Sequence, residues 1–401
     1  IHEVTMFLTM NEYFDIQIKE SLMKAKIDDM IQLRQEREKL MYFYRGQQTY
    51  YDDYLLNLIT EDPERKLWLK ARLRTVNFTE KVIKQKSKTY RETPEVEVWQ
   101  NESINKESSK KYNELLKQSN AGVIRKEIER CTNLLGRTAV LVAEDKTEQS
   151  GIRIELITDF TPYYLDGTYN IYKPDAIIYP IAMNKGITDV TKQINMAWTS
   201  TSYCFVDNSL KFVDFVWNGE VINGWQPHNY DRMPIFFPYS SLPTDSFWVK
   251  MKSSVVSNNQ VLNIQKTLQL DRYIYQAYKQ LLSFGLSEEE TKKIRLGVDK
   301  ILSTNLGKNE ADFKYLDLND ETLDQKVLYF KDTYDQALDE ENLTSKYAKP
   351  SERSGIAIQV EASEQIEDRQ DLQDFMRDSL ELPLYDTIQM VGRNIGLQFP
   401  K

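Results

Sequence analysis

The stretch 297–309 is the part of this chain most similar to a phosphate-binding loop. Such a loop has the spacing G-x-x-x-x-G-K-[ST], which lets consecutive backbone N–H groups enclose the phosphates of a nucleotide. Here Gly297 lies ten residues before Gly307, and Lys308 is followed by Asn309. Because this spacing cannot enclose a phosphate, the sequence does not predict a nucleotide hydrolase.

Carboxylates are the next residues that could do chemistry. Adjacent acids occur at 28–29, 52–53 and 288–290. Active-site pairs are rare among surface acids, so these are expected to be solvated charges. A carboxylate-dependent nuclease is kept as a minor alternative.

Histidine and cysteine are too sparse to build a site. His2 and His228 are distant from each other, and Cys131 and Cys204 are far apart with no C-x-x-C pattern. A disulfide scaffold and a zinc site are therefore not expected. The scarcity of cysteine instead predicts assembly in a cytosolic compartment. His228 is interpreted as structural. The sequence predicts no catalytic residue, no metal site, no cofactor and no enzymatic activity.

One cluster of cations is more informative. Lys346, Lys349 and Arg353 fall in a polar stretch, 341–354, that Pro350 interrupts. The whole chain has a formal charge of −9, so this cluster is a local exception. It could touch phosphates weakly, or it could be an ordinary solvated loop.

Amino-acid composition limits which functional classes the chain can belong to. A protein that grips DNA usually has a basic surplus, whereas an acidic wall repels phosphates and lets the polymer pass. The net charge therefore fits either a conduit or a protein that never meets DNA. There is no run of eighteen apolar residues and no signal-peptide pattern, so contact with a membrane is not expected.

Long helices surround the basic cluster. Apolar periodicity predicts one helix over 258–284 and another over 321–340, joined by a small mixed helix-and-strand insert, 286–318. The loop 341–354 follows, and then a third long helix, 356–391. The insert is too small to bury its own core, so it needs neighbours.

The rest of the chain is mixed. Helices are expected over 10–45, 63–90 and 108–135, and alternating apolar residues predict strands within 150–240. Pro383 should kink the last long helix. The predicted fold class is α+β.

Short phrases mark the boundaries between these elements. An aromatic run ending in Tyr44 and Gly46 closes the first helix, and Gly46 should stop it. Gly136 precedes an apolar strand and should admit a close approach of the backbone. Pro234 lies in a phrase, 227–237, that follows the β-rich part. Ser354, Gly355 and Ala357 follow the basic loop.

The order of these elements and phrases, over roughly residues 35 to 395, resembles the bacteriophage portal proteins, the head-to-tail connectors of phage capsids. The resemblance implies a mixed wing, a long-helix stem, a small clip, a channel loop and a spine helix. The parts would be an N-terminal helical part of the wing (1–95), an α/β wing (96–256), stem helix 1 (257–285), clip (286–318), stem helix 2 (319–340), channel or tunnel loop (341–354), and spine helix with the base of a crown (355–401).

The resemblance also implies a function. Portal subunits form a closed homo-oligomeric ring, usually of about twelve copies, at a unique vertex of the virion capsid. The ring is the channel for packaging and ejection of double-stranded DNA. The clip would bind the terminase and then the head–tail adaptor, and the wing would meet the major capsid and scaffolding proteins. Lys346, Lys349 and Arg353 would face the DNA.

Two alternatives belong to other classes. One is another virion structural or adaptor protein without a DNA channel. The other is a nucleic-acid enzyme whose site has no familiar motif. A ring with a central hole would favour the portal over both.

Overall fold

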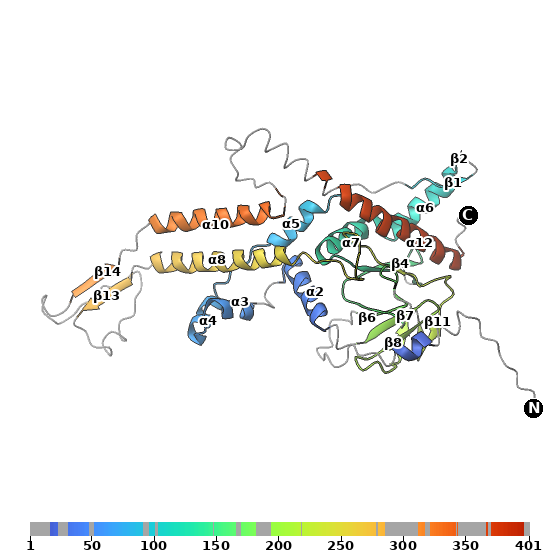
Figure 1. Ribbon diagram of the computed structural model, residues 1–401, viewed down its shortest axis with the longest axis horizontal. Coiled ribbons are helices and arrows are strands. Elements are labelled where there is room, and N and C mark those ends of the chain that lie inside the picture. Colours follow the sequence, from blue (N-terminus) through green and yellow to red (C-terminus); the bar gives the residue numbers. More distant parts are fainter. Residues whose placement is uncertain are drawn as a thin grey trace, which may run out of the picture. The chain divides into compact units, whose positions relative to one another are not determined.

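The computed structural model describes residues 17–22, 31–47, 52–90, 96–100, 103–146, 148–165, 170–181, 194–217, 219–277, 280–284, 312–316, 321–341, 343, 366–367 and 370–396 (Figure 1). Its helices and antiparallel sheets confirm the predicted α+β class. The chain divides into two compact units. The first comprises Ile1–Tyr44, Glu80–Ser253 and Gly355–Lys401, and the second comprises Arg45–Thr79 and Ser254–Ser354.

The first unit is built around β3 (Ala139–Glu144), the middle strand of a three-stranded sheet between β12 (Ile235–Phe236) and β4 (Ile152–Ile157). Both faces of β3 are buried. Val140 and Val142 pack into a core that includes the helices, while Leu141 points into a second core. Successive side chains of a strand point to opposite faces, so β3 joins the two cores.

The second core lies between β3 and an antiparallel five-stranded sheet. Trp198 and Phe205 are its largest wholly buried aromatic side chains from that sheet. The strand order is β11-β8-β7-β6-β5. The strands are β5 (Thr161–Tyr163), β6 (Ala176–Pro180), β7 (Asn195–Thr199), β8 (Ser202–Val206) and β11 (Gln226–Pro227). Two small hairpins accompany them: β1 (Trp99–Gln100) with β2 (Ser103–Ile104), and β9 (Phe215–Trp217) with β10 (Glu220–Ile222).

Helices supply the other side of the first core. They are α6 (Lys106–Gln118), α7 (Ala121–Leu135) and α12 (Leu382–Asn394). Two further helices are α2 (Ile31–Tyr44) and α5 (Phe78–Lys86), of which α5 begins in the second unit. Apolar residues of α6, α7 and α12 meet the Val140 face of β3, with Leu116, Ile128 and Leu384 among them. The C-terminal helix is therefore part of the core of the first unit.

The second unit contains two long helices and a strand pair. They are α8 (Ser253–Ala277), β13 (Gln280–Phe284), β14 (Asp312–Leu316) and α10 (Glu321–Asp339). The two strands pair antiparallel, with Gln280 opposite Leu316. Two short helices, α3 (Asp52–Ile59) and α4 (Pro63–Lys70), complete the unit.

The helix expected over 258–284, the core of stem helix 1 (257–285), is corrected at both ends. It begins at Ser253 and ends at Ala277, and Gln280–Phe284 is a strand. Pairing with β14, far along the sequence, outweighs the local helical periodicity there. The strand expected near 311–318 is confirmed as β14, and the rest of the clip insert lies outside the described residues.

Two other expected helices are interrupted. The region 63–90 is divided by the non-helical stretch 71–77 between α4 and α5. The region 108–135 is divided at Asn120, whose φ of 54° is left-handed, a conformation that asparagine tolerates. Within 10–45, helix is described over 17–22 and in α2, and the remainder lies outside the described residues.

The last long helix carries a π-helical turn, Arg377–Glu381, just before Pro383. Leu382 donates its backbone N–H to the carbonyl of Arg377, five residues earlier. Proline has no N–H to donate. A π turn therefore lies immediately upstream of Pro383, where a kink was expected, between the helical stretch 370–376 and α12.

Candidate functional site

One face of α8 carries a row of polar side chains spaced by four residues. Residues at this spacing lie on one side of a helix. All of them are buried, so each needs a hydrogen-bond partner within the protein. We call this row the α8 polar ladder; it consists of Asn259, Asn263, Thr267 and Asp271.

Asn259 forms the first rung. Its Oδ1 accepts hydrogen bonds from the backbone N–H of Thr79 at 2.9 Å and from the Thr79 hydroxyl at 3.0 Å. Its Nδ2 donates to the carbonyl oxygen of Val76 at 2.8 Å. The amide therefore binds the chain on both its donor and its acceptor side.

The next two rungs bind the adjoining backbone. Val76 donates its N–H to Oδ1 of Asn263 at 2.7 Å, and Arg74 donates its N–H to Oγ1 of Thr267 at 3.1 Å. The Thr267 hydroxyl also donates to the carbonyl of Asn263 at 2.8 Å. These bonds replace the helical hydrogen bonds that Arg74 and Val76 would otherwise form, which explains why 71–77 is not helical.

Asp271 is the last rung and the only charged one. Its carboxylate accepts a hydrogen bond from Nε1 of Trp68 at 2.8 Å and forms an ion pair with Arg65. The guanidinium of Arg72 stacks on the Trp68 ring, 3.3 Å from the ring centroid. Residues of α4 and just after it thereby anchor to α8 through one buried carboxylate.

The other side of α8 contacts α10. Ser254 donates its hydroxyl to Glu341 at 3.0 Å, and Gln265 donates its side-chain N–H to Thr333 at 3.1 Å. Moving forward along α8 means moving backward along α10, so the two helices are antiparallel. With β13 and β14, the chain runs out along α8 and returns along α10.

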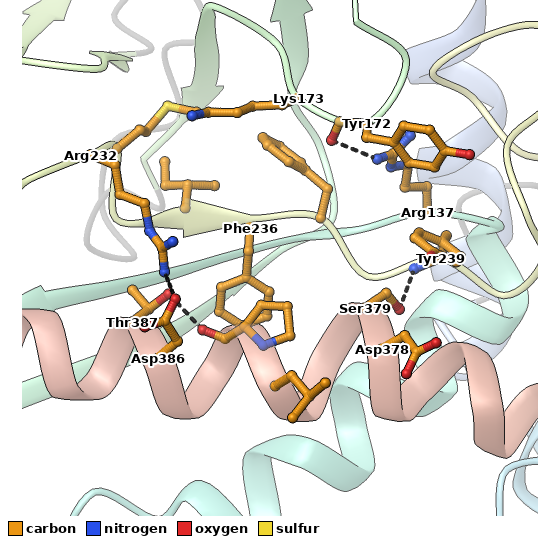
Figure 2. Close-up of a pocket in the computed structure, with 15 residues that line it drawn as sticks. Arg137, Tyr172, Lys173, Arg232, Phe236, Tyr239, Asp378, Ser379, Asp386 and Thr387 are labelled. Carbon is orange, nitrogen blue, oxygen red and sulfur yellow. Dashed lines mark hydrogen bonds and ion pairs between the residues drawn. The ribbon is translucent and has the colours of Figure 1, made fainter. Parts of the chain in front are cut away.

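The first unit contains a cavity of about 650 Å³ beside the π turn (Figure 2). Its base is apolar, and its rim carries both signs of charge. The lining residues are Arg137, Tyr172, Lys173, Arg232, Met233, Ile235, Phe236, Phe237, Tyr239, Asp378, Ser379, Leu382, Pro383, Asp386 and Thr387.

Arg137 is committed to the main chain around this cavity. Its guanidinium donates to the carbonyls of Ile171 and Phe247 at 2.7 Å each and to that of Tyr172 at 3.0 Å. It also lies over the Phe247 ring, 3.9 Å from the centroid. Its role is to tie together loops distant in sequence.

Three other polar side chains of the cavity bind groups of the protein itself. Arg232 forms an ion pair with Asp386 across the rim (Figure 2). The Ser379 hydroxyl donates to the carbonyl of Phe375 at 2.6 Å and accepts the backbone N–H of Tyr239 at 3.2 Å. No histidine or cysteine lines the cavity, so the lining contains no Ser–His or Cys–His pair of the kind used for acyl transfer.

The predicted motif residues Tyr44 and Gly46 close α2. The phenol of Tyr44 is buried and donates to Oε2 of Glu127 at 3.2 Å, and burial raises the pKa of Tyr44. Gly46 has a φ of 70°, the left-handed conformation that ends helices. Both residues shape the end of the helix.

Gly136 and Pro234 lie at opposite ends of the pairing between β3 and β12. A Cβ atom on Gly136 would lie 2.4 Å from the carbonyl oxygen of Val249, which confirms the expected close approach of the backbone. Pro234 accepts the N–H of Val142 at 3.0 Å, and Gly136 accepts that of Ser240 at 2.9 Å. Both glycine and proline therefore frame the pairing of β3 with β12.

The other predicted site residues, Lys346, Lys349, Arg353, Ser354, Gly355 and Ala357, lie outside the described residues. The assignment of the channel loop stays a prediction.

Histidine, cysteine and acidic side chains are the groups that could support catalysis or bind a metal. The described part of the chain contains no cluster of three or more His, Cys, Asp or Glu side chains that could hold a metal ion. Both cysteines are buried, and burial raises the pKa of Cys204 to about 12, which disfavours the reactive thiolate. His228 contacts the Thr199 carbonyl through Nε2 at 3.2 Å and packs beside Trp198, as expected of a structural histidine. None of the described helices has the length and apolar character needed to cross a bilayer.

Sequence reasoning missed the α8 polar ladder. The signal was present, because four polar residues recur at intervals of four along one side of the helix. It was hidden because polar residues on a long helix normally face solvent.

Comparisons with known proteins identify no family. No family model matches the sequence, and no curated protein matches it. One similar solved structure is a chain from the virion of a native gene transfer agent particle, with 13% sequence identity and a TM-score of 0.32. The match covers 81% of this chain and 87% of that chain. A similarity this low does not establish a common fold.

Proposed function

We propose that this chain is a bacteriophage portal subunit, a structural and conducting protein of the virion and not an enzyme. Copies of it would form a closed ring at one vertex of the capsid, through which double-stranded DNA is packaged and ejected. The chain would assemble in the host cytoplasm.

The observation that carries the proposal is the excursion through α8, β13, β14 and α10. After Ser253 the chain belongs to the second unit, where α8 leads to a two-stranded sheet and α10 returns antiparallel to α8. It re-enters the first unit after Ser354. Two antiparallel helices joined through a small strand pair support the assignment of a stem and a clip that the sequence resemblance implies.

The charge of the chain is compatible with this role. A net charge of −9 keeps phosphates from adhering along a conduit. The cluster Lys346, Lys349 and Arg353 would supply the local contacts with DNA. In this proposal, the end formed by β13 and β14 binds first the terminase and later the head–tail adaptor, and the wing meets the capsid and scaffolding proteins. ATP hydrolysis would belong to the terminase.

Electron microscopy of the purified chain tests the proposal. A portal gives rings with a central hole, and native mass spectrometry gives one fixed subunit number. A chain that stays monomeric by light scattering at high concentration, with no rings on the grid, would contradict it. A nuclease or ATPase activity that co-purifies with the chain, and that disappears when the chain is removed, would also contradict the proposal.

A further inference from the structure

The α3–α4 hairpin of the second unit exposes large apolar side chains. Leu67 is 74% exposed and Leu58 58%, and Tyr54 and Trp68 are also exposed. Exposed apolar residues gathered on one small element, beside cations, mark a surface that another molecule covers. We define the α4 surface as Leu67, Trp68, Lys70, Arg72 and Arg74.

The α10 helix exposes a second apolar surface. Leu328 is 57% exposed and Tyr329 64%. With about 100° between successive residues, these two share one side of α10 with Asp332, Gln336 and Asp339, which are also exposed. The opposite side holds Ala337 and Leu338, which are buried. We define the α10 surface as Leu328, Tyr329, Asp332, Gln336 and Asp339.

The two surfaces are complementary in charge. The α4 surface carries three cations, of which Lys70 pairs with Asp53 of its own chain. The α10 surface carries two carboxylates, and the exposed Lys331, three residues after Leu328, lies at its edge. An apolar centre with opposite charges around it favours one orientation of docking.

The two surfaces lie on opposite flanks of one subunit. The α8 polar ladder faces the segment 65–79, whereas Ser254, Asn258 and Gln265 of α8 face α10. Around α8 the centres of these two groups are about 180° apart. Figure 1 shows α3 and α4 on one side of α8 and α10 on the other. The α4 surface is therefore not covered by α10 of its own chain.

We infer that the α4 surface of one copy packs against the α10 surface of the next copy. Head-to-tail contacts of a closed ring need two different, complementary surfaces on opposite flanks of each subunit. This inference rests on the proposed ring, and it specifies which elements form the contact between neighbours.

Cysteine cross-linking tests the contact. We expect the double variant Leu67→Cys with Tyr329→Cys to give a ladder of covalent oligomers under mild oxidation. An equimolar mixture of the two single variants should stop at covalent dimers. The native cysteines are both buried, so they do not compete. The matched control pairs Leu67→Cys with Val123→Cys, which is 70% exposed on α7 and should give no ladder.

Charge exchange gives a second, independent measurement. Arg74→Glu alone and Asp332→Lys alone should each lower the yield of rings by about tenfold or more, and the chain with both changes should recover at least half of it. Circular dichroism of each variant checks that it folds.

The outcomes separate the contact from the function. A ladder or a charge rescue supports the contact. Rings of the unmodified chain with neither a ladder nor a rescue would overturn the inference and leave the portal proposal standing. A ladder from open chains without a central hole would support the contact and contradict the portal. The absence of any oligomer would overturn both.

Discussion

The carboxylate of Asp271 on α8 accepts a hydrogen bond of 2.8 Å from the indole nitrogen of Trp68 on α4. The same carboxylate pairs with Arg65, and its side chain is 5% exposed, against 31% for that of Arg65. Trp68 belongs to the part of the second unit before Thr79 and Asp271 to the part after Ser254. The bond therefore joins two segments that are far apart in the sequence.

Substitution of Asp271 should separate the hydrogen bond from the charge. Asp271→Asn keeps an acceptor for Trp68 but loses the ion pair, which solvent around Arg65 weakens, so we expect a loss of about 1 kcal/mol. Asp271→Ala removes this acceptor from both Trp68 and Arg65, and we expect a loss of about 2–3 kcal/mol. Urea unfolding followed by tryptophan fluorescence measures both. Equal losses would show that the hydrogen bond to Trp68 contributes nothing.

Asn259→Ala should be the most damaging change in the α8 polar ladder. It removes the partner of the Thr79 N–H, the Thr79 hydroxyl and the Val76 carbonyl at once. Buried groups left without partners cost about 1–3 kcal/mol each, partly recovered by relaxation, so we expect a loss of about 2–4 kcal/mol. The matched control is Ser257→Ala on the exposed side of α8, expected within about 0.5 kcal/mol of the unmodified chain. Similar losses of stability for both variants would show that the α8 polar ladder does not stabilise the fold.

Gly136→Ala tests the close backbone approach before β3. The added methyl would lie 2.4 Å from the Val249 carbonyl oxygen and 2.9 Å from that of Lys250. Since backbone atoms must shift, we expect a loss of more than about 3 kcal/mol in thermal or urea unfolding. Gly219→Ala is the control, because its φ of 84° is similarly left-handed but nothing lies within 4 Å of the added atom. That control should lose only about 1–2 kcal/mol, the cost of the backbone conformation. A Gly136 variant no worse than its control would remove the steric explanation.

The sequence was sufficient to predict elements whose patterns are local. The α+β class, the β-rich region after residue 150, the stop at Gly46 and the close approach at Gly136 all follow from residue type and spacing. It was insufficient where a distant partner decides the structure. β13 is a strand because β14 pairs with it, and 71–77 is not helical because side chains of α8 bind its backbone. Periodicity within a window cannot reveal such partners.

The same limit applied to the candidate site. The four residues of the α8 polar ladder are spaced like an ordinary solvent-facing stripe. The ladder differs from a solvent-facing stripe only in its burial: Asn259 is 0% exposed and Asp271 is 4% exposed. Burial depends on which segment packs against the helix, and that segment lies before residue 80.

Glu129 on α7 should make stability depend on pH. The side chain is buried and accepts the backbone N–H groups of Thr89 at 2.9 Å and Tyr90 at 3.5 Å. Burial raises the pKa of Glu129 above its ordinary value, so the folded state holds the proton more tightly than the unfolded state. The stabilisation from this proton is present below the unfolded pKa, near 4.5, and is lost as the pH rises through the folded pKa.

Comparison with Glu129→Gln isolates this effect. The variant cannot ionise, so its stability relative to the unmodified chain should increase as the pH rises from about 4.5 toward neutrality. A constant offset from the different geometry of the amide does not change that slope. Thermal unfolding of both proteins across this range measures it. A difference that is flat with pH would show that the pKa of Glu129 is the same in both states.

Neutralisation of the basic loop tests the proposed contact with DNA. We expect Lys346→Gln, Lys349→Gln and Arg353→Gln together to leave ring formation intact and to reduce packaging or retention of DNA several-fold in an in vitro packaging assay. The physical reason is that these cations are a local basic cluster in a chain of net charge −9. The matched control is Lys106→Gln, Lys110→Gln and Lys117→Gln, which removes the same charge from exposed positions on α6.

If both triple variants package DNA as well as the unmodified chain does, the loop does not act through its charge. If both are impaired equally, net charge rather than the position of these cations is what matters. A loss confined to the loop variant would favour direct contact with the DNA backbone. Retention of DNA by the unmodified chain should then weaken at higher salt, because salt screens phosphate contacts.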